Sequence, residues 1–254
     1  MSVSKIKATV FSQEQLASDV FSMWLEVGSM ASEAKPGQFI SVYSNDDSKL
    51  LPRPISICEI DKETGRLRIV YRVVGYGTKE FSGCKAGDTL EIMGPLGNGY
   101  TLKKDKAILV AGGIGVPPML ELAKELDCEK TIVLGYRDEL FLNKEFEQYG
   151  KVVIATEDGS CGTKGNVLDA IRAESVDGQV IYSCGPTPML RALKQYAADK
   201  GIEAWISLEE KMACGIGACL ACVCKSKEVD GHTNVHNKRV CKEGPVFLAE
   251  EVEL

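Results

Sequence analysis

The sequence predicts a β-barrel, then a doubly wound α/β domain, then a small cysteine-rich module. Three observations support this order. The first hundred residues are short β-branched segments separated by turn residues, strands alternate with helices from Lys106 onward, and five of the ten cysteines lie between Cys214 and Cys241. We expect the boundaries at residues 1–100, 101–208 and 209–254.

The barrel is predicted from alternating or β-branched segments at 5–11, 20–27, 38–43 and 66–74. The last of these reads RLRIVYRVV and is the strongest strand pattern in the chain. Pro36-Gly37, Gly65 and Gly87-Asp88 supply turns between the segments. The glycine-rich run at 94–99 is the expected end of the domain.

Two motifs in the barrel have residues suited to binding. Arg53-Pro54-Ile55-Ser56 holds a cation and a hydroxyl three residues apart on a segment that its prolines keep extended. Tyr71-Arg72 is followed by Gly75-Tyr76-Gly77-Thr78, whose glycines let backbone N–H groups approach an anion. Taken alone, an arginine on a strand more often belongs to a solvated face than to a ligand site.

In the α/β region, strands are expected at 107–111, 131–136, 152–156, 180–183 and 204–208, and helices at 118–126, 167–172 and 189–200. The first strand runs into a loop containing Gly113 and Gly115 that opens a helix at Pro118. Such a loop can hold a pyrophosphate at the helix N-terminus, although Pro118 replaces the third glycine of the usual fingerprint and a purely structural turn stays possible. Cys184-Gly185-Pro186 ends a later strand at the edge where open α/β sheets bind ligands.

The cysteine-rich module has the spacing of an iron–sulfur ligand set. Cys214, Cys219 and Cys222 read C-x4-C-x2-C, and Cys241 follows after eighteen intervening residues, which is the plant-type pattern for a 2Fe–2S cluster. Interleaved glycines allow the tight loop that such a cluster needs. Cys224 would point to the opposite side of an extended strand and is interpreted as a bystander.

Other interpretations of the cysteines are weaker. A zinc finger made with His232 and His236 would have only nine residues between Cys222 and His232 and would leave Cys214 and Cys241 without a role. A disulfide framework is disfavoured because no secretory signal is seen and the other cysteines are scattered singly. Five buried structural thiols are disfavoured by the 4-2 spacing.

Composition limits the function classes. The 254 residues are 44% hydrophobic and 26% charged, with a formal net charge of −6, which argues against a nucleic-acid partner. No run approaches eighteen apolar residues and no signal peptide is recognised, so we expect a cytoplasmic protein without a membrane span.

The motifs and their order resemble the ferredoxin reductase superfamily, and within it the electron transfer subunits of type B dihydroorotate dehydrogenase. That likeness extends to the tail, from Glu210-Lys211-Met212 through Cys219 and from Arg239 to Phe247. It implies that FAD is bound by residues of both barrel motifs: Arg53, Pro54, Ile55, Ser56, Val70, Tyr71, Arg72, Gly77 and Thr78. Arg53 and Arg72 would contact the pyrophosphate and Ser56 the flavin edge. The resemblance also implies that Gly113, Gly115, Pro118 and Cys184 bring NAD against the flavin, and that Cys214, Cys219, Cys222 and Cys241 hold the cluster.

The resemblance further implies a division of labour. An FMN-containing catalytic subunit would oxidise dihydroorotate in pyrimidine (UMP) biosynthesis, and electrons would cross through the cluster and FAD to NAD+, in a heterotetramer with two of each subunit. Two alternatives stay open: a flavin and iron–sulfur reductase subunit for ferredoxin–NADP, sulfide or hydrogenase systems, and a non-enzymatic redox-sensing metal module. Arg137, Asp138 and Glu139 leave NAD against NADP undecided, since they offer both a cation and acids.

Overall fold

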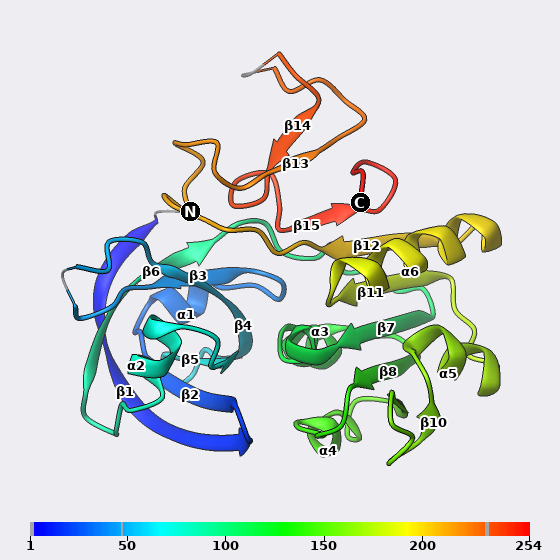
Figure 1. The fold of residues 1–254 in the computed structure, drawn as a ribbon, viewed down its shortest axis with the longest axis horizontal. Helices are drawn as coiled ribbons and strands as arrows, with labels where there is room; N and C mark the ends of the chain where they lie inside the picture. Colours follow the sequence, from blue (N-terminus) through cyan, green and yellow to red (C-terminus); the bar gives the residue numbers. More distant parts are fainter. Residues whose placement is uncertain (1–2, 47, 232–233) are drawn as a thin grey trace.

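The computed structural model describes residues 3–46, 48–231 and 234–254. A barrel and a helix-flanked sheet lie side by side, and a small hairpin module sits across the top of both (Figure 1). The expected architecture, a barrel joined to a doubly wound domain with a C-terminal module, is confirmed.

The barrel closes through strands in the order β1 (Ser4–Ala17), β2 (Val20–Glu26), β5 (Arg66–Arg72), β4 (Arg53–Asp61), β3 (Phe39–Val42) and β6 (Thr89–Leu96). Alternate residues such as Ile40, Ile57 and Ile69 fill its interior because side chains alternate between the faces of a strand. The strand pattern missed β6 and gave β4 only as an extended segment. Two short helices, α1 (Met30–Glu33) and α2 (Tyr76–Phe81), complete the domain. The expected glycine loop at 75–78 is in fact the start of α2.

The sheet has the order β10 (Thr163–Lys164), β9 (Lys151–Thr156), β8 (Lys130–Tyr136), β7 (Ala107–Gly112), β11 (Val180–Cys184), β12 (Glu203–Ser207) and β15 (Val246–Leu248). Neighbouring strands are parallel up to β12, as a doubly wound sheet requires. β15 is the exception, because it pairs antiparallel with β12 and comes from the C-terminal module. That module is therefore attached to the sheet by a strand ladder.

Helices cover both faces of this sheet. The face with Ile108 and Val110 packs against α5 (Val167–Ala173) and α6 (Thr187–Lys200). The face with Leu109 packs against α3 (Pro118–Glu125) and α4 (Asn143–Phe146), and a 3-10 turn η1 (Gly113–Gly115) precedes α3. In the described part of the chain, no helix is long and apolar enough to cross a membrane.

Helix α3 joins the sheet to the barrel wall. Its Glu121 is buried and accepts a hydrogen bond from the Ile60 N–H at 2.8 Å. Nearby, the buried Arg68 of β5 forms ion pairs with Glu59 of the barrel at 2.7 Å and Glu145 of α4 at 2.5 Å. These contacts hold helices α3 and α4 of the sheet domain against β4 and β5 of the barrel.

Besides β15, the C-terminal module contains the hairpin β13 (Val223–Lys225) and β14 (Asn237–Arg239) and the loop before it. Its Cys222 and Cys241 belong to the apolar cluster that also contains Phe39 and Leu96 of the barrel and Phe247 of β15. The module thus shares a core with both domains.

Candidate functional site

A cavity of about 640 Å³ lies between the barrel, the η1 turn and the segment that leads from β12 into the module. Its barrel side is formed by Arg53, Pro54, Ile55, Ser56, Val70, Tyr71, Arg72, Val74 and Thr78. The two barrel motifs, which are far apart in sequence, therefore meet on one wall. Ile114 of η1 closes the cavity from the sheet.

The guanidinium of Arg53 lies against Gly77 of the second motif. A β-carbon built on Gly77 would lie 2.2 Å from Arg53 Nε, so a larger residue there would force the Arg53 side chain into another rotamer. The Nη1 group of the same guanidinium donates a hydrogen bond to the Leu51 carbonyl at 2.6 Å. Gly77 does not itself line the cavity, and its part is to admit Arg53.

Thr78 and Tyr71 are fixed by hydrogen bonds. The Thr78 hydroxyl accepts from the N–H groups of Val74 at 3.0 Å and Gly75 at 3.2 Å, which closes the first turn of α2. Tyr71 is buried and its hydroxyl donates to Gln13 at 2.9 Å. Burial raises the pKa of Tyr71 well above its ordinary value. It is therefore a neutral wall of the cavity.

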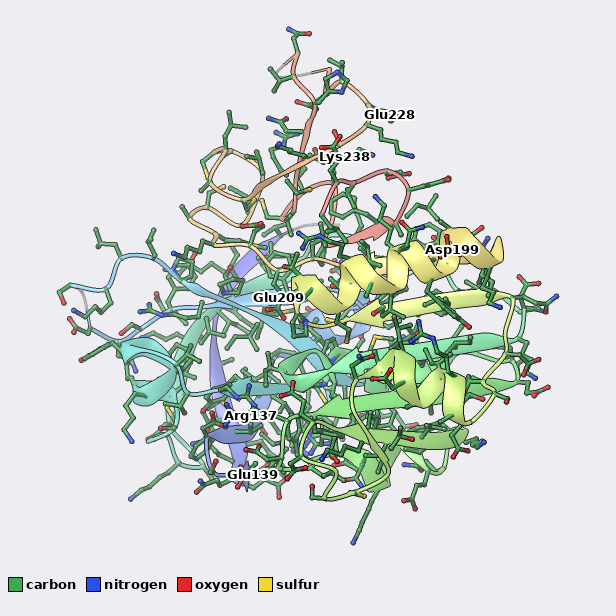
Figure 2. All side chains as sticks on the ribbon, turned by 45° about the vertical axis from the view of Figure 1, so that its right-hand side comes forward. Arg137, Glu139, Asp199, Glu209, Glu228 and Lys238 are labelled. Carbon is green, nitrogen blue, oxygen red and sulfur yellow. The ribbon has the colours of Figure 1, made fainter. Side chains whose placement is uncertain are left out.

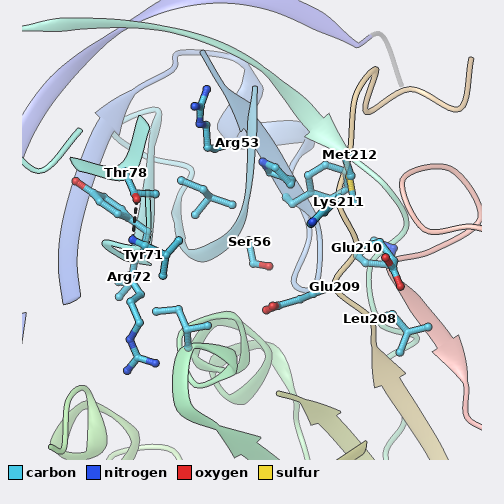
Figure 3. A pocket seen from close by; sticks show the side chains of 17 residues that line it. Arg53, Ser56, Tyr71, Arg72, Thr78, Leu208, Glu209, Glu210, Lys211 and Met212 are labelled. Atoms are coloured by element: carbon cyan, nitrogen blue, oxygen red, sulfur yellow. Dashed lines mark hydrogen bonds between the residues drawn. The ribbon is translucent and has the colours of Figure 1, made fainter. Parts of the chain in front are cut away.

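Arg72 and Arg53 point away from each other in the cavity (Figure 3). Arg72 Nε lies 3.1 Å from Asp19 Oδ2, although it is not aligned for a hydrogen bond. That both guanidinium groups contact one pyrophosphate stays a prediction. Arg53, beside the N-terminus of α2, is the better placed of the two for a phosphate.

The remaining wall is the segment from Leu208 to Met212, which the sequence pattern did not single out for binding. Glu209, Glu210, Lys211 and Met212 all line the cavity, and the Glu209 carboxylate and the Ser56 hydroxyl reach into the same part of it (Figure 3). Glu209 lies where the barrel, the sheet and the module meet (Figure 2). Glu209 is an exposed residue, but the protein around its carboxyl partly desolvates that group and so raises its pKa above the ordinary value.

The four predicted cluster cysteines come together in two pairs. The sulfur atoms of Cys214 and Cys219 are 3.3 Å apart, and the N–H of Cys241 donates to the sulfur of Cys222 at 3.4 Å. The second pair forms because the β13–β14 hairpin brings Val240 back to the Cys222 carbonyl at 2.9 Å. Among the described residues, no three or more His, Cys, Asp or Glu side chains surround a single metal position. Two thiolate pairs suit two irons better than one zinc ion.

Backbone N–H groups point at these sulfurs. Gly217 donates to Cys241 at 3.2 Å and Cys219 donates to Cys214 at 3.4 Å. Burial acts to raise the pKa of Cys214, but N–H groups including those of Ile216 and Cys219 outweigh it and lower this pKa to about 7. Donors of this kind stabilise thiolates, which are the form that binds metal.

Cys224 and His236 make contacts outside this set. Cys224 of β13 donates its thiol to the Lys238 carbonyl at 3.5 Å, and burial raises its pKa to about 11. The His236 ring nitrogen Nδ1 is 2.8 Å from the Lys227 carbonyl. His232, the other histidine of the zinc alternative, lies outside the described residues.

The predicted nicotinamide residues lie at the carboxyl edge of the sheet. Gly113 has a φ of +54°, and a β-carbon on it would meet nothing within 4 Å, so this turn is open. Gly115 packs against the Cys184 backbone, because a β-carbon there would lie 2.4 Å from the Cys184 carbonyl oxygen. Pro118 begins α3. The turn at Gly113–Gly115 is thus in direct contact with the turn that follows Cys184.

Cys184 itself is fully buried, and burial raises the pKa of its thiol strongly. It lines neither the main cavity nor a second cavity of about 430 Å³ between α6 and the module, although the adjacent Gly185 and Pro186 line the second one. Glu209 borders both cavities. A direct role of Cys184 stays a prediction.

The residues that could distinguish NAD from NADP make contacts with other parts of the protein. Arg137 is exposed and pairs with Asp138 at 3.3 Å. Glu139 accepts from the hydroxyl of Ser18 at 2.6 Å, which ties it to the barrel. Both lie at the end of the sheet away from the module (Figure 2).

The cavity of the barrel faces the edge of the doubly wound sheet that carries the glycine turns, and a four-cysteine module lies beside it. This arrangement defines a flavin-dependent oxidoreductase with an iron–sulfur centre. Solved structures agree. The chain is similar to a structure titled as the NADH-dependent reduced ferredoxin-NADP oxidoreductase, with a TM-score of 0.87 and 31% identity over 97% of this chain and 89% of that one. A ferredoxin reductase of carbazole 1,9a-dioxygenase shares the fold, with a TM-score of 0.65 and 22% identity over 80% of this chain and 67% of that one.

Two family models match. Residues 7–100 match the oxidoreductase FAD-binding domain, and residues 209–253 match the iron–sulfur cluster binding domain of dihydroorotate dehydrogenase B. The chain is 44% identical to the electron transfer subunit of dihydroorotate dehydrogenase B (NAD(+)) from Fusobacterium nucleatum, over 97% of both chains. It is also 44% identical to that of Caldanaerobacter subterraneus, over 98% of both.

The chain therefore belongs to the family of dihydroorotate dehydrogenase B electron transfer subunits. This confirms the predicted family, its class as an electron-transferring oxidoreductase subunit, and FAD and iron–sulfur as its cofactor types.

Proposed function

We propose that this chain passes electrons from a dihydroorotate-oxidising catalytic subunit to NAD+ in pyrimidine biosynthesis. One observation carries the proposal. The segment Glu209–Met212 lines the flavin cavity, and the first cluster ligand, Cys214, follows two residues later. A single short stretch of backbone thus connects the two cofactor sites.

The residues that would hold the cofactors follow from the geometry. Arg53, with Gly77 making room for it, would bind a flavin phosphate, and Ser56 would face the flavin ring. Cys214, Cys219, Cys222 and Cys241 would hold the cluster. Bound FAD would supply the exchange between a hydride and single electrons, and a bound 2Fe–2S cluster would supply single-electron transfer.

NAD+ would approach from the sheet. Gly113 and Gly115 suit its pyrophosphate, because glycines let backbone N–H groups approach an anion closely. The positive end of the α3 dipole would add to this attraction, although Pro117 and Pro118 at the start of α3 have no N–H to donate. The turn after Cys184 lies against Gly115, so both would border the dinucleotide. NAD rather than NADP is proposed because the relatives' name specifies NAD(+).

The catalytic partner would dock over the module. Ile216 and Leu220 lie between the cluster cysteines in sequence and are 45% and 51% exposed, which gives the ligand loop an apolar outer surface. We propose an FMN-containing partner in a heterotetramer with two of each subunit. The unpaired thiols fit a cytoplasmic location.

A ferredoxin–NADP function is the second candidate, since a solved structure with that title is 31% identical. The 44% identity to the dihydroorotate dehydrogenase subunits and the match of the cluster domain favour the pyrimidine enzyme. A redox-sensing module without flavin is not supported, because the barrel matches an FAD-binding domain.

The test uses the chain alone and mixed with its catalytic partner. Alone, it should pass electrons from NADH to an artificial dye and should not oxidise dihydroorotate. Mixed with the partner, it should confer NAD+ reduction by dihydroorotate, and Cys222→Ser should abolish this coupling while sparing the NADH-to-dye reaction. Dihydroorotate oxidation by the isolated chain, or coupling that survives Cys222→Ser, would contradict the proposal.

A further inference from the structure

Ser41 of β3 is a buried polar group without an evident role. Its side chain is fully buried, and its hydroxyl has no hydrogen-bond partner among the residues that the structure describes. Leaving a buried hydroxyl unpaired is unfavourable, so most such groups have a hydrogen-bond partner. The position of Ser41 indicates what that partner is.

Ser41 lies on the outer face of the barrel, under the module. Neighbouring Ile40 and Val42 point into the barrel core, whereas Phe39, on the same face as Ser41, packs with Cys222 and Cys241. The hydroxyl faces the cluster loop: a β-carbon on Gly215 would lie 3.0 Å from Ser41 Oγ. Gly215 directly follows the first ligand, Cys214.

The surroundings of the hydroxyl are otherwise apolar. The same β-carbon position would lie 3.4 Å from Leu96 Cδ1 and 3.6 Å from Met93 Cε. Pro54, which faces Ser41 across the β3–β4 ladder, has no N–H and lines the flavin cavity. Ser41 therefore lies at the point where the barrel wall separates the flavin cavity from the cluster loop.

We propose that the Ser41 hydroxyl donates a hydrogen bond to a sulfur of the bound cluster at the Cys214 corner. Sulfur in such a cluster is electron-rich, and a donor stabilises the more negative, reduced state more than the oxidised one. Ser41 therefore raises the reduction potential of the cluster. Through this direct contact, a residue of the barrel would set the reduction potential of the cluster. The inference rests on the proposed function only in that the four cysteines hold the cluster.

The test is a redox titration of the purified chain, followed by the electron paramagnetic signal of the reduced cluster. Ser41→Ala should shift the reduction equilibrium of the cluster about tenfold towards the oxidised form, which corresponds to about 59 mV for one electron. Ser41→Thr keeps the hydroxyl and should stay close to the unaltered chain. The flavin content should be the same in all variants.

Ser183→Ala is the matched control. Ser183 of β11 is also buried with an unpaired hydroxyl, but it lies inside the parallel sheet. Its substitution should leave the cluster potential unchanged. If Ser41→Ala shifts the potential no more than Ser183→Ala does, or if Ser41→Thr shifts it as much as Ser41→Ala, the proposal is wrong. If Ser41→Ala keeps its flavin but loses the cluster while Ser41→Thr retains it, the hydroxyl contact is supported. None of these readings needs the catalytic partner, so they are independent of the coupling test.

Discussion

The guanidinium of Arg53 occupies the space that a side chain on Gly77 would need, with Arg53 Nε 2.2 Å from that β-carbon position. The two residues belong to different motifs, on β4 and α2. Binding by Arg53 should therefore depend on a glycine that does not line the cavity.

Gly77→Ala should displace Arg53 and weaken FAD binding while the cluster content stays normal. Gly77 does not have a positive φ, so the effect comes from the contact and not from backbone strain. Gly75→Ala is the control, because a β-carbon on Gly75 meets nothing within 4 Å and its φ of −162° suits any residue. Flavin content after gel filtration measures the outcome. Equal flavin loss in both variants would contradict the role given to Gly77.

Arg53→Ala should weaken FAD binding about tenfold to a hundredfold, because it removes a charge-assisted contact worth about 1.5–3 kcal/mol. Iron content should not change. The FAD dissociation constant, measured by quenching of flavin fluorescence, checks this. Wild-type affinity in Arg53→Ala would show that Arg53 is only a solvated strand residue.

Each of four single serine substitutions should remove the visible absorbance and the paramagnetic signal of the cluster, because a tetrathiolate set needs all four sulfurs. The four positions are Cys214, Cys219, Cys222 and Cys241. Cys224→Ser is the matched control, since Cys224 is also in the module but donates to the Lys238 carbonyl. An intact cluster in Cys241→Ser would refute the ligand assignment.

The affinity for FAD should fall as the pH rises through the raised pKa of Glu209. Burial raises this pKa, so the carboxyl holds its proton to a higher pH than an exposed glutamate and then adds a negative charge facing the flavin cavity. The sign for stability is the same: the contribution of Glu209 is complete below its unfolded pKa and is lost as the pH rises through the folded value.

Glu209→Gln cannot ionise, so it should flatten the pH profile of FAD binding, measured by fluorescence titration. Glu63→Gln, at an exposed turn of the barrel, serves as the control and should keep the slope of the unaltered chain. A slope that persists in Glu209→Gln would assign the pH dependence to another group.

Several elements were predictable because their signals are local in the chain. The C-x4-C-x2-C spacing, the proline-flanked Arg53–Ser56 segment and the glycine turn before Pro118 each depend on residues close in sequence. Strong strand patterns likewise located β2, β3 and β5 to within two residues at either end. Strand β6 was missed because its pattern runs directly into the glycine-rich stretch that was expected to be a turn.

By itself the sequence determined the barrel and the doubly wound sheet, since chain connectivity and side-chain periodicity specify them, and it predicted the cysteine ligand set from its spacing. Only the tertiary structure decided which distant residues meet: Gly77 beside Arg53, Gly215 over Ser41, Glu209 between two cavities, and β15 on the edge of β12. The physical reason is that these contacts arise from closing the barrel and packing three units into one core. Such contacts depend on shape and burial across the whole chain, and no spacing along it records them.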